Sequence, residues 1–290
     1  MTGPGPAASR PTGVRRWGGY VAFVLVFAIA CGLLSWWQWA RREEALGRID
    51  LVERNWDAPA VPLDELLPAP GAADPEAEWH PVLLSGEYLV DEELFVRGRP
   101  RDGAPGFAQL VPFRLDDGRV IAVDRGWLPN SSDGVLPGAD PAPPEGEVEL
   151  VVRLRLGEPE LPGRGAPEGQ LATINLPQLA EALDGVVPAD RVDTGMYGLL
   201  ADEAPAPAEP RPAPALRPEA DEGPHLSYAL QWIMFALVAI GGLVWAWRRE
   251  LRIARLPAAQ QDAARRERRS SRDDLEEDAL LDAAEGRGRE

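Results

Sequence analysis

Residues 225–247 read HLSYALQWIMFALVAIGGLVWAW, and the interpretation of the rest of the chain depends on this stretch. After His225 it contains no charged residue. In an α-helix, about 20 apolar residues that each rise about 1.5 Å cross the ~30 Å hydrocarbon layer of a bilayer. The stretch therefore predicts a membrane-spanning helix over residues 225–247.

The polar side chains of this stretch gather near its beginning and on one side. At about 100° per residue, one face contains His225, Tyr228, Ala229, Trp232, Ala236 and Leu243. Tyr and Trp favour the headgroup level of a membrane because each joins an apolar ring to a polar atom. From the residues alone, the face is either an interfacial anchor or a functional stripe.

A second apolar run lies near the N-terminus, at residues 17–39 (WGGYVAFVLVFAIACGLLSWWQW). It is too long for the core of a signal peptide, and no convincing cleavage site follows it, so we expect a retained membrane helix. Ala28, Gly32 and Ser35 recur at the spacing of small residues that lets membrane helices approach closely, and Ala229 gives the other helix a small face. We therefore expect the two helices to pack together.

The placement of arginine predicts the orientation of both helices. Cytoplasmic flanks of membrane helices are enriched in Lys and Arg. Three arginines and no acidic residue lie in segment 1–16, and four arginines follow the second helix within 248–255. Acidic residues instead precede that helix. We expect a protein of the bacterial plasma membrane with both termini in the cytoplasm and residues from about Arg41 to Pro224 outside.

Between the two helices, the periodicity changes from that of helices to that of strands. Residues 40–55 keep apolar positions at helical spacing, so the first helix should continue until Pro59 and Pro62 break it. Five apolar-rich runs separated by Gly, Pro and Asp are typical of antiparallel strands. They are residues 82–89, 94–98, 107–115, 119–127 and 148–156. Asp116-Asp117-Gly118 is expected to form a hairpin turn.

The remaining elements are shorter. Asn175 should cap a helix over residues 176–183, and residues 196–200 offer a last strand. Residues 201–224 are rich in Ala, Pro and Glu, which predicts a semi-extended tether that does not pack.

The predicted fold class is an α+β membrane protein. Two transmembrane helices flank an extracytoplasmic, antiparallel β-rich, barrel-like domain. The expected segments are a disordered cytoplasmic N-terminus (1–16), the first span (17–39), the β-rich domain with a helical entry (40–200), the tether (201–224), the second span (225–247) and a charged, disordered cytoplasmic tail (248–290).

Composition excludes several classes of function. All 30 residues counted as Lys or Arg are arginines, so no Schiff-base or P-loop lysine exists. The net charge of -17 argues against a nucleic-acid partner, because binding phosphate groups requires a basic surface. The single cysteine, Cys31, offers neither a disulfide framework nor a Cys-rich metal site. Catalytic motifs are missing in their required contexts, so we expect a protein that is not an enzyme.

Several short blocks occur in an order that is typical of one protein family. They are Gly86-Glu87-Tyr88, Val96-Arg97-Gly98-Arg99-Pro100, Pro105-Gly106-Phe107, Val111-Pro112-Phe113, Asp117-Gly118, Val123-Asp124-Arg125-Gly126-Trp127-Leu128-Pro129 and His225-Leu226-Ser227-Tyr228-Ala229-Leu230-Gln231-Trp232. Together they resemble the surfeit-locus family of cytochrome c oxidase biogenesis (assembly) factors. The last two blocks are the most specific. The chain departs from the family at Asp124, where Asn is usual, and in its long C-terminal tail.

The resemblance implies a function, a cofactor and site residues. It implies a membrane assembly factor for cytochrome c oxidase, a haem-copper oxidase, that assists delivery of haem a to the catalytic subunit. Its partners would be that subunit, the haem a synthesis machinery and the lipid bilayer. By resemblance, His225 is the candidate ligand of the haem iron, with Tyr228 and Trp232 beside the macrocycle, and no other metal is expected. Arg125 and Trp127 are candidates for contacting a partner or a haem propionate.

Other interpretations stay open at this point. Arg125 and Trp127 are equally consistent with a strand-end ion pair and a core indole, and His225 with a helix-entry residue. One alternative function is a scaffold that stabilises an oxidase assembly intermediate without binding haem. Another is a membrane-anchored hydrolase or sensor domain unrelated to respiration.

Overall fold

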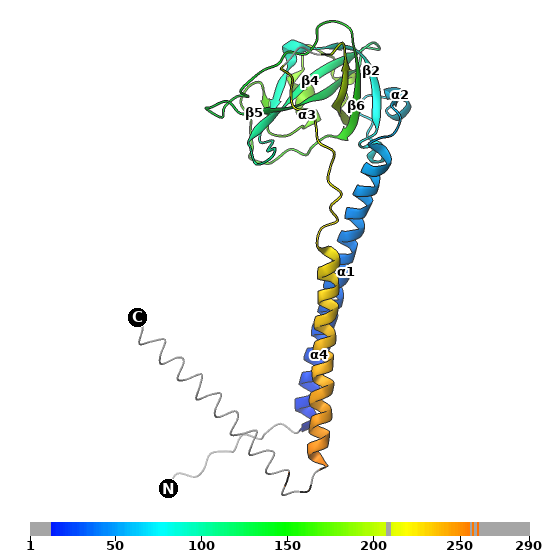
Figure 1. Ribbon diagram of the computed structural model, residues 1–290, viewed down its shortest axis with the longest axis vertical. Helices are drawn as coiled ribbons and strands as arrows, with labels where there is room; N and C mark the ends of the chain where they lie inside the picture. The colour runs from blue at the N-terminus through cyan, green and yellow to red at the C-terminus, as the bar shows by residue number, and fades with distance from the viewer. Residues whose placement is uncertain (1–12, 207–209, 256, 258–259, 261–290) are drawn as a thin grey trace, which may run out of the picture. The chain divides into compact units, whose positions relative to one another are not determined.

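The computed structural model describes residues 13–206, 210–255, 257 and 260 (Figure 1). The chain divides into two compact units, which we describe separately. The helical unit comprises the chain up to Glu43 together with the chain from Gly223 onward. The β-domain comprises Glu44–Glu222.

Two long helices carry the apolar runs of the sequence. Helix α1 spans Gly13–Asn55 and helix α4 spans His225–Ala254. Both are long and apolar enough to cross a membrane. The expected continuation of the first helix to Asn55 is confirmed. Helix α1 begins four residues before the expected start, and α4 continues to Ala254, inside the segment expected to be disordered. Most of the expected terminal tails lie outside the described residues.

A closed barrel of five strands forms the centre of the β-domain (Figure 1). The barrel strands are β2 (Pro81–Tyr88), β4 (Gly106–Leu115), β5 (Val120–Pro129), β6 (Val148–Leu156) and β8 (Met196–Ala204). They pair in the order β2-β6-β8-β5-β4, and the pairing of β4 back to β2 closes the ring. The predicted α+β class, with two apolar helices flanking a barrel-like domain, is confirmed.

Smaller elements surround the barrel. They are β1 (Val61–Pro62), α2 (Leu63–Leu66), β3 (Leu94–Val96), β7 (Gln170–Leu171), α3 (Leu176–Ala182) and the 3-10 turns η1 (Pro75–Ala77), η2 (Val90–Glu92) and η3 (Ala189–Arg191). Asn175 caps α3 as expected, because its side-chain oxygen accepts a hydrogen bond from the backbone N–H of Gln178 at 3.0 Å. The five expected strands are all present, and the turn at residues 116–118 joins β4 to β5.

Two features of the middle region go beyond what was expected. Most strand pairs are antiparallel, as predicted, but β8 runs parallel to β5, and the short strands β1 and β7 pair parallel to β2 and β3. The expected tether also packs. Strand β8 continues to Ala204, Pro212 is buried, and Ala213 forms an isolated bridge with Trp127. Propensity reasoning missed this pairing because Ala- and Pro-rich sequences carry no strand signal of their own.

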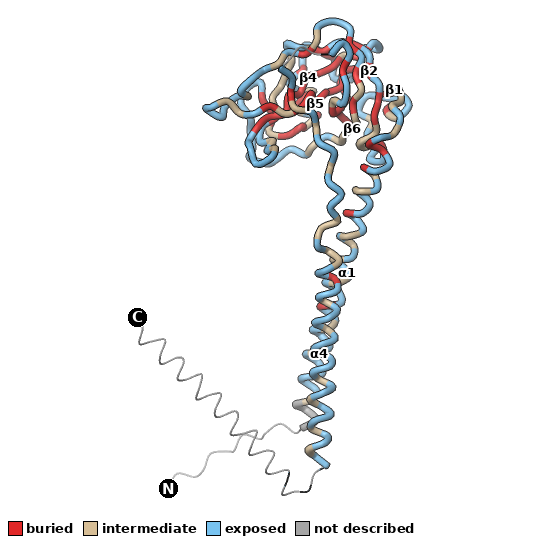
Figure 2. Tube along the Cα trace, viewed as in Figure 1, coloured by how far each residue is buried: buried red, intermediate tan, exposed pale blue. Residues whose placement is uncertain are grey.

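Burial is concentrated in the strands of the β-domain, while α1 and α4 are mostly exposed (Figure 2). One cluster of fully buried side chains fills the barrel and includes Leu84, Phe113, Leu150 and Met196. A second cluster lies where α3 covers the sheet, around Leu176, Leu179 and Leu183. Along β6, buried residues alternate with more exposed ones, so one face of the strand is buried and the other is wetter.

Candidate functional site

In the helical unit, the less exposed residues of each long helix form a narrow stripe, which we call the helix seam. Along α1 the stripe is Val24, Ala28, Cys31, Ser35 and Gln38; along α4 it is His225, Ala229, Trp232, Ala236, Ala239 and Leu243. Both sets recur at alternating intervals of four and three residues. This spacing is typical of helices packed side by side in a left-handed pair.

Two interhelical hydrogen bonds fix how the helices meet at the seam. The hydroxyl of Ser35 donates to the backbone carbonyl of Ala229 at 3.0 Å, and Gln38 contacts His225 at 2.9 Å. Later residues of α1 therefore meet earlier residues of α4, so the helices are antiparallel. The expected packing of small residues is confirmed at Ser35 and Ala229. It is wrong at Gly32, which is exposed and has open space beside it.

His225 is the first residue of α4, and one of its ring nitrogens is already engaged. Nδ1 lies 2.9 Å from Oε1 of Gln38. Among the described residues, the opposite nitrogen, Nε2, has no hydrogen-bond partner. Gly223 lies beside that edge of the ring: a Cβ at this position would stand 3.3 Å from both Cδ2 and Nε2 of His225. The imidazole is thus held at Nδ1, and a glycine lies beside its Nε2 edge.

The other predicted residues of α4 occupy different positions. Trp232 lies in the seam, on the same stripe as His225, and its ring packs edge-on against Phe235 with centroids 5.7 Å apart. Tyr228 lies off the stripe and is 47% exposed. The described structure therefore aligns Trp232 with His225 and turns Tyr228 outward. The roles of all three residues toward haem stay predictions.

The remaining histidine has a local contact. His80 lies at the entrance to β2, and its Nδ1 is 2.9 Å from the backbone carbonyl of Pro81. Among the described residues, no group of three or more His, Cys, Asp or Glu side chains is placed to hold a metal ion.

Arg125 lies at the centre of a polar cluster inside the β-domain. Its side chain is only 1% exposed and forms an ion pair with Glu203, whose side chain is 3% exposed. Its guanidinium donates to Oε1 of Gln109 and to the carbonyl of Pro141, both at 2.9 Å. Tyr88 donates to the same Glu203 at 2.6 Å. The cluster joins strands β2, β4, β5 and β8.

These contacts match the ion-pair alternative for Arg125. A carboxylate from outside would have to displace Glu203 before it could reach the guanidinium, so contact with a propionate or partner stays a prediction. Burial and the hydrogen bond to Glu203 both raise the pKa of Tyr88. Nearby, the pKa of Glu93 is raised to about 7, mainly by burial, with a further contribution from the charge and hydrogen bonding of Asp140.

Trp127 is half-buried at the end of β5. Its indole N–H donates to the backbone carbonyl of Arg99 at 2.7 Å. Its backbone pairs with Ala213, and Gly106 lies directly against the indole ring. The side chain therefore fills a slot between neighbouring segments, as the alternative of a packed indole requires.

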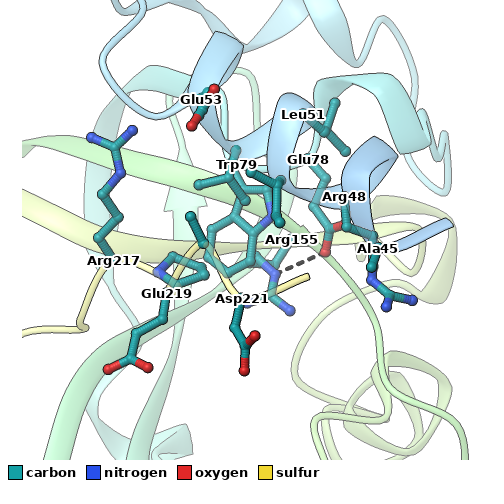
Figure 3. A pocket seen from close by; sticks show the side chains of 14 residues that line it. Ala45, Arg48, Leu51, Glu53, Glu78, Trp79, Arg155, Arg217, Glu219 and Asp221 are labelled. Carbon is teal, nitrogen blue, oxygen red and sulfur yellow. Dashed lines mark hydrogen bonds and ion pairs between the residues drawn. The ribbon is translucent and has the colours of Figure 1, made fainter. Parts of the chain in front are cut away.

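A cavity of about 300 Å³ lies within the β-domain where the last part of α1 approaches β6 and residues 217–221 (Figure 3). Arg155 reaches into it, paired with Glu78 at 2.8 Å and stacked on Trp79, with its guanidinium carbon 3.7 Å from the ring centroid. Trp79 has a φ of 71°, which is unusual for a side chain of this size. The pairing of Arg155 with Glu78 is a tertiary contact, so the local sequence around Arg155 does not indicate it.

Gln38 is the functional candidate that the sequence reasoning missed. A signal was available, because Gln38 is an amide inside an otherwise apolar run. Polar residues within membrane helices are uncommon and usually have a partner. The partner itself could be identified only after the antiparallel pairing of the helices was known.

The fold defines a class of protein. It has two helices long and apolar enough to span a membrane and a closed five-stranded barrel, so it is a membrane-anchored β-barrel protein. Comparison with known sequences is consistent with this class. The sequence model of the SURF1 family matches residues 25–237. The chain therefore belongs to the SURF1 family, and the resemblance to the surfeit-locus family is confirmed.

Individual relatives extend over different parts of the chain. A SURF1-like protein of Mycobacterium tuberculosis is 33% identical over 245 residues, which cover 82% of this chain and 86% of the relative. A SURF1-like protein of Rickettsia felis is 22% identical over 214 residues, covering 71% and 87%. The cytochrome oxidase assembly protein SHY1 of Saccharomyces cerevisiae is 35% identical over 78 residues, covering 25% and 20%.

Proposed function

We propose that this protein is a membrane assembly factor for cytochrome c oxidase that assists the delivery of haem a to the catalytic subunit. Membership of the SURF1 family carries the first half of the proposal, together with the similarity to a yeast protein named as a cytochrome oxidase assembly protein. The arrangement of residues at His225 supports the second part of the proposal, the delivery of haem a.

The residues at the seam would suit an imidazole ligand of haem iron. A neutral imidazole binds iron through an unprotonated nitrogen, and Nδ1 of His225 is engaged by Gln38. Because Gly223 has no side chain, no methyl group presses on the edge of the ring at Nε2. Haem a, when bound, supplies the redox-active iron that the finished oxidase needs. His225 would hold the iron through Nε2.

The aromatic residues of α4 would shield the flat faces of the macrocycle. Trp232 lies on the seam with His225, so it can offer apolar surface deeper along the helix. The exposed Tyr228 lies one turn from His225, where its ring and hydroxyl suit the boundary between lipid and water. Both residues contribute packing area and hydrogen bonding without an iron bond.

The proposed partners are the catalytic subunit of the oxidase and the haem a synthesis machinery, met in the plane of a bacterial plasma membrane. In the proposed orientation, both termini are cytoplasmic and the β-domain is outside. Arg125 and Trp127 would act on a partner mainly through the shape of the barrel end that they stabilise, because Arg125 is enclosed.

The test is purification of the tagged, full-length protein from a strain that makes haem a. We expect the oxidase catalytic subunit and haem a to co-purify with it, and a deletion strain to lose oxidase activity. Co-purification of the subunit without haem would support the scaffold alternative. Full oxidase activity in the deletion strain would contradict the assembly function.

Substitutions at the two histidines locate the iron ligand. His225→Ala should abolish or shift the haem absorbance without changing the amount of protein in the membrane, because one side chain contributes little to insertion of so apolar a helix. Trp232→Ala should weaken haem retention less, since the iron bond remains. His80→Ala is the matched control and should keep the wild-type spectrum. An unchanged spectrum for His225→Ala would exclude it as the ligand.

A further inference from the structure

The contact between Gln38 and His225 places the one amide side chain of the α1 stripe against the one imidazole of the α4 stripe. The seam positions before Gln38 on α1 are small or apolar, apart from the hydroxyl of Ser35 one turn away, and the partly exposed Arg42 lies one turn after Gln38. A polar pair held in an apolar helix seam is costly unless its hydrogen bonds are satisfied, so such pairs usually have a function or act as glue.

The atoms of this contact determine where the imidazole proton lies. A neutral imidazole has one nitrogen that donates and one that accepts. Oε1 of Gln38 is a carbonyl oxygen and can only accept, so Nδ1 of His225 carries the proton and donates across 2.9 Å. The lone pair is then on Nε2. Metal-binding histidines are commonly oriented in this way, through a hydrogen bond from the other ring nitrogen to an oxygen.

Gly223 lies against the edge of the imidazole that bears Nε2. Gly223 has a φ of +69°, a conformation that side-chain-bearing residues seldom adopt, and a Cβ there would meet Cδ2 and Nε2 at 3.3 Å. Glycine at this position therefore keeps a methyl group away from the ring edge that bears the lone pair. Nε2 is therefore both the nitrogen that carries the lone pair and the nitrogen beside which residue 223 has no side chain.

We propose that Gln38 is a positioning residue for His225. It fixes the proton on Nδ1, holds the ring plane, and presents the lone pair of Nε2 past Gly223 to the iron of a haem. This inference rests on the proposed function for the identity of the bound group. The tautomer itself is a property of the protein without haem and can be measured independently.

A purely structural role for Gln38 makes different predictions. Interhelical hydrogen bonds in membrane proteins contribute little on average, and a residue that only joins the helices would act through helix association alone. The bond from Ser35 to Ala229 joins the same two helices one turn away without touching the imidazole. Ser35→Ala is therefore the matched control, because it removes an interhelical hydrogen bond and leaves His225 alone.

The first experiment uses the full-length, haem-free protein in lipid nanodiscs with ¹⁵N-labelled histidine. The chain has two histidines, so His80→Ala assigns the signals. We expect a neutral His225 with protonated Nδ1 and unprotonated Nε2 in the wild type and in Ser35→Ala. In Gln38→Leu, the Nε2 resonance should move toward the protonated range. Gln38→Glu keeps an acceptor oxygen and should restore the wild-type tautomer.

Either of two results would overturn the proposal. One is a wild-type spectrum with the proton on Nε2, which requires no variant to fold. The other is Gln38→Leu with an unchanged tautomer, which would leave Gln38 as a helix contact only. Should Gln38→Leu fail to accumulate, the wild-type spectrum and the Gln38→Glu variant still decide the question.

The second experiment titrates haem a into the same proteins and follows absorbance. Loss of a hydrogen bond to a metal-binding histidine typically costs about 10- to 100-fold in metal affinity, and we expect this loss for Gln38→Leu but not for Ser35→Ala. Gly223→Ala should also weaken haem binding while leaving the proton on Nδ1. If the wild type binds no haem but shows the expected tautomer, the proposed function loses its cofactor and the positioning of His225 stands. If haem binds equally to wild type and Gln38→Leu, the positioning role is wrong.

Discussion

Trp127 and Ala213 exchange both of their backbone hydrogen bonds, each 2.9 Å long. Trp127 belongs to β5, while Ala213 comes from the Ala- and Pro-rich segment that follows β8. The segment thus returns to the barrel and adds a bridge to its surface. Shortening residues 201–218, which the tether interpretation would allow, should therefore destabilise the β-domain.

A proline at Ala213 tests this bridge directly. Ala213→Pro removes the N–H that donates to the carbonyl of Trp127, and we expect it to cost about 1 kcal/mol or more of the free energy of unfolding. Ala215→Pro is the control, since the N–H of Ala215 donates to no backbone group among the described residues. Thermal unfolding of the detergent-solubilised protein measures both. Equal midpoints for the two variants would contradict a stabilising bridge.

Gly126 should tolerate no side chain. It has a φ of +135°, and a Cβ would stand 2.5 Å from the carbonyl oxygen of Ala213. We expect Gly126→Val to abolish accumulation of the protein in the membrane. Gly118→Ala separates backbone strain from the steric clash, because Gly118 also has positive φ but nothing lies near its Cβ position. Its cost should be about 1 kcal/mol. Wild-type levels of Gly126→Val would contradict the packing at this site.

Asp124 should make the stability of the β-domain depend on pH. Burial raises its pKa from 3.8 to about 6, although its carboxylate accepts a hydrogen bond from the backbone N–H of Gly126. The folded state then binds more protons than the unfolded state between these values, so stability falls as pH rises through this window. Asp124→Asn should be more stable than wild type above pH 6, by up to about 3 kcal/mol, and similar to it near pH 4.

Asp133 provides a control of opposite sign. Hydrogen bonds from the Ser131 hydroxyl and the Val135 N–H lower the pKa of this exposed carboxylate. Asp133→Asn should therefore lose stability relative to wild type at neutral pH and match it at low pH. Thermal midpoints across pH 2 to 8 measure both variants. A constant difference between Asp124→Asn and wild type would contradict the raised pKa of Asp124.

The buried ion pair should be costly to break. Arg125→Gln leaves the Glu203 carboxylate enclosed without its cation, and we expect a loss of about 3–5 kcal/mol. A double variant, Arg125→Gln with Glu203→Gln, should recover part of this loss, because neither charge then remains unpaired. Denaturant unfolding of all three variants measures the coupling. If Arg125→Gln unfolds like wild type but no longer binds the oxidase subunit, Arg125 acts on a partner instead.

The orientation in the membrane is open to direct measurement. We expect proteinase K added to intact spheroplasts to cut between Pro214 and Pro224, where Leu216 is 62% exposed, and to spare a tag at Glu290. The bridge at Ala213 should protect the residues just before it. Removal of the Glu290 tag from intact spheroplasts would reverse the proposed topology.

Local patterns in the sequence were sufficient to predict most of the elements. The apolar runs, the turn at residues 116–118 and the cap at Asn175 follow from signals carried by a few adjacent residues. Barrel closure was harder, because the pairing of β2 with both β4 and β6 joins residues distant in the chain. The parallel pairing of β5 with β8 gives no periodicity that differs from antiparallel pairing.

In the candidate site too, some features could be predicted from local sequence, while others depend on contacts between distant residues. The importance of His225 was inferred from the family block around it, and its position at the start of a helix followed from hydropathy. Its partner Gln38 required knowledge of how α1 and α4 align. Arg125 shows the opposite case, since nothing in its local sequence indicates that Glu203 will enclose it.

Closure of the barrel restricts how the β-domain can be recognised. Many proteins capture an extended peptide by adding it as an extra strand to an exposed sheet edge. Here the five barrel strands use one another's backbone groups, and β1 and β7, which end the described sheet order, have two residues each. The described strands thus offer almost no template for strand addition, either to a client chain or to a second copy of this protein. The β-domain must therefore recognise a partner through side-chain contacts.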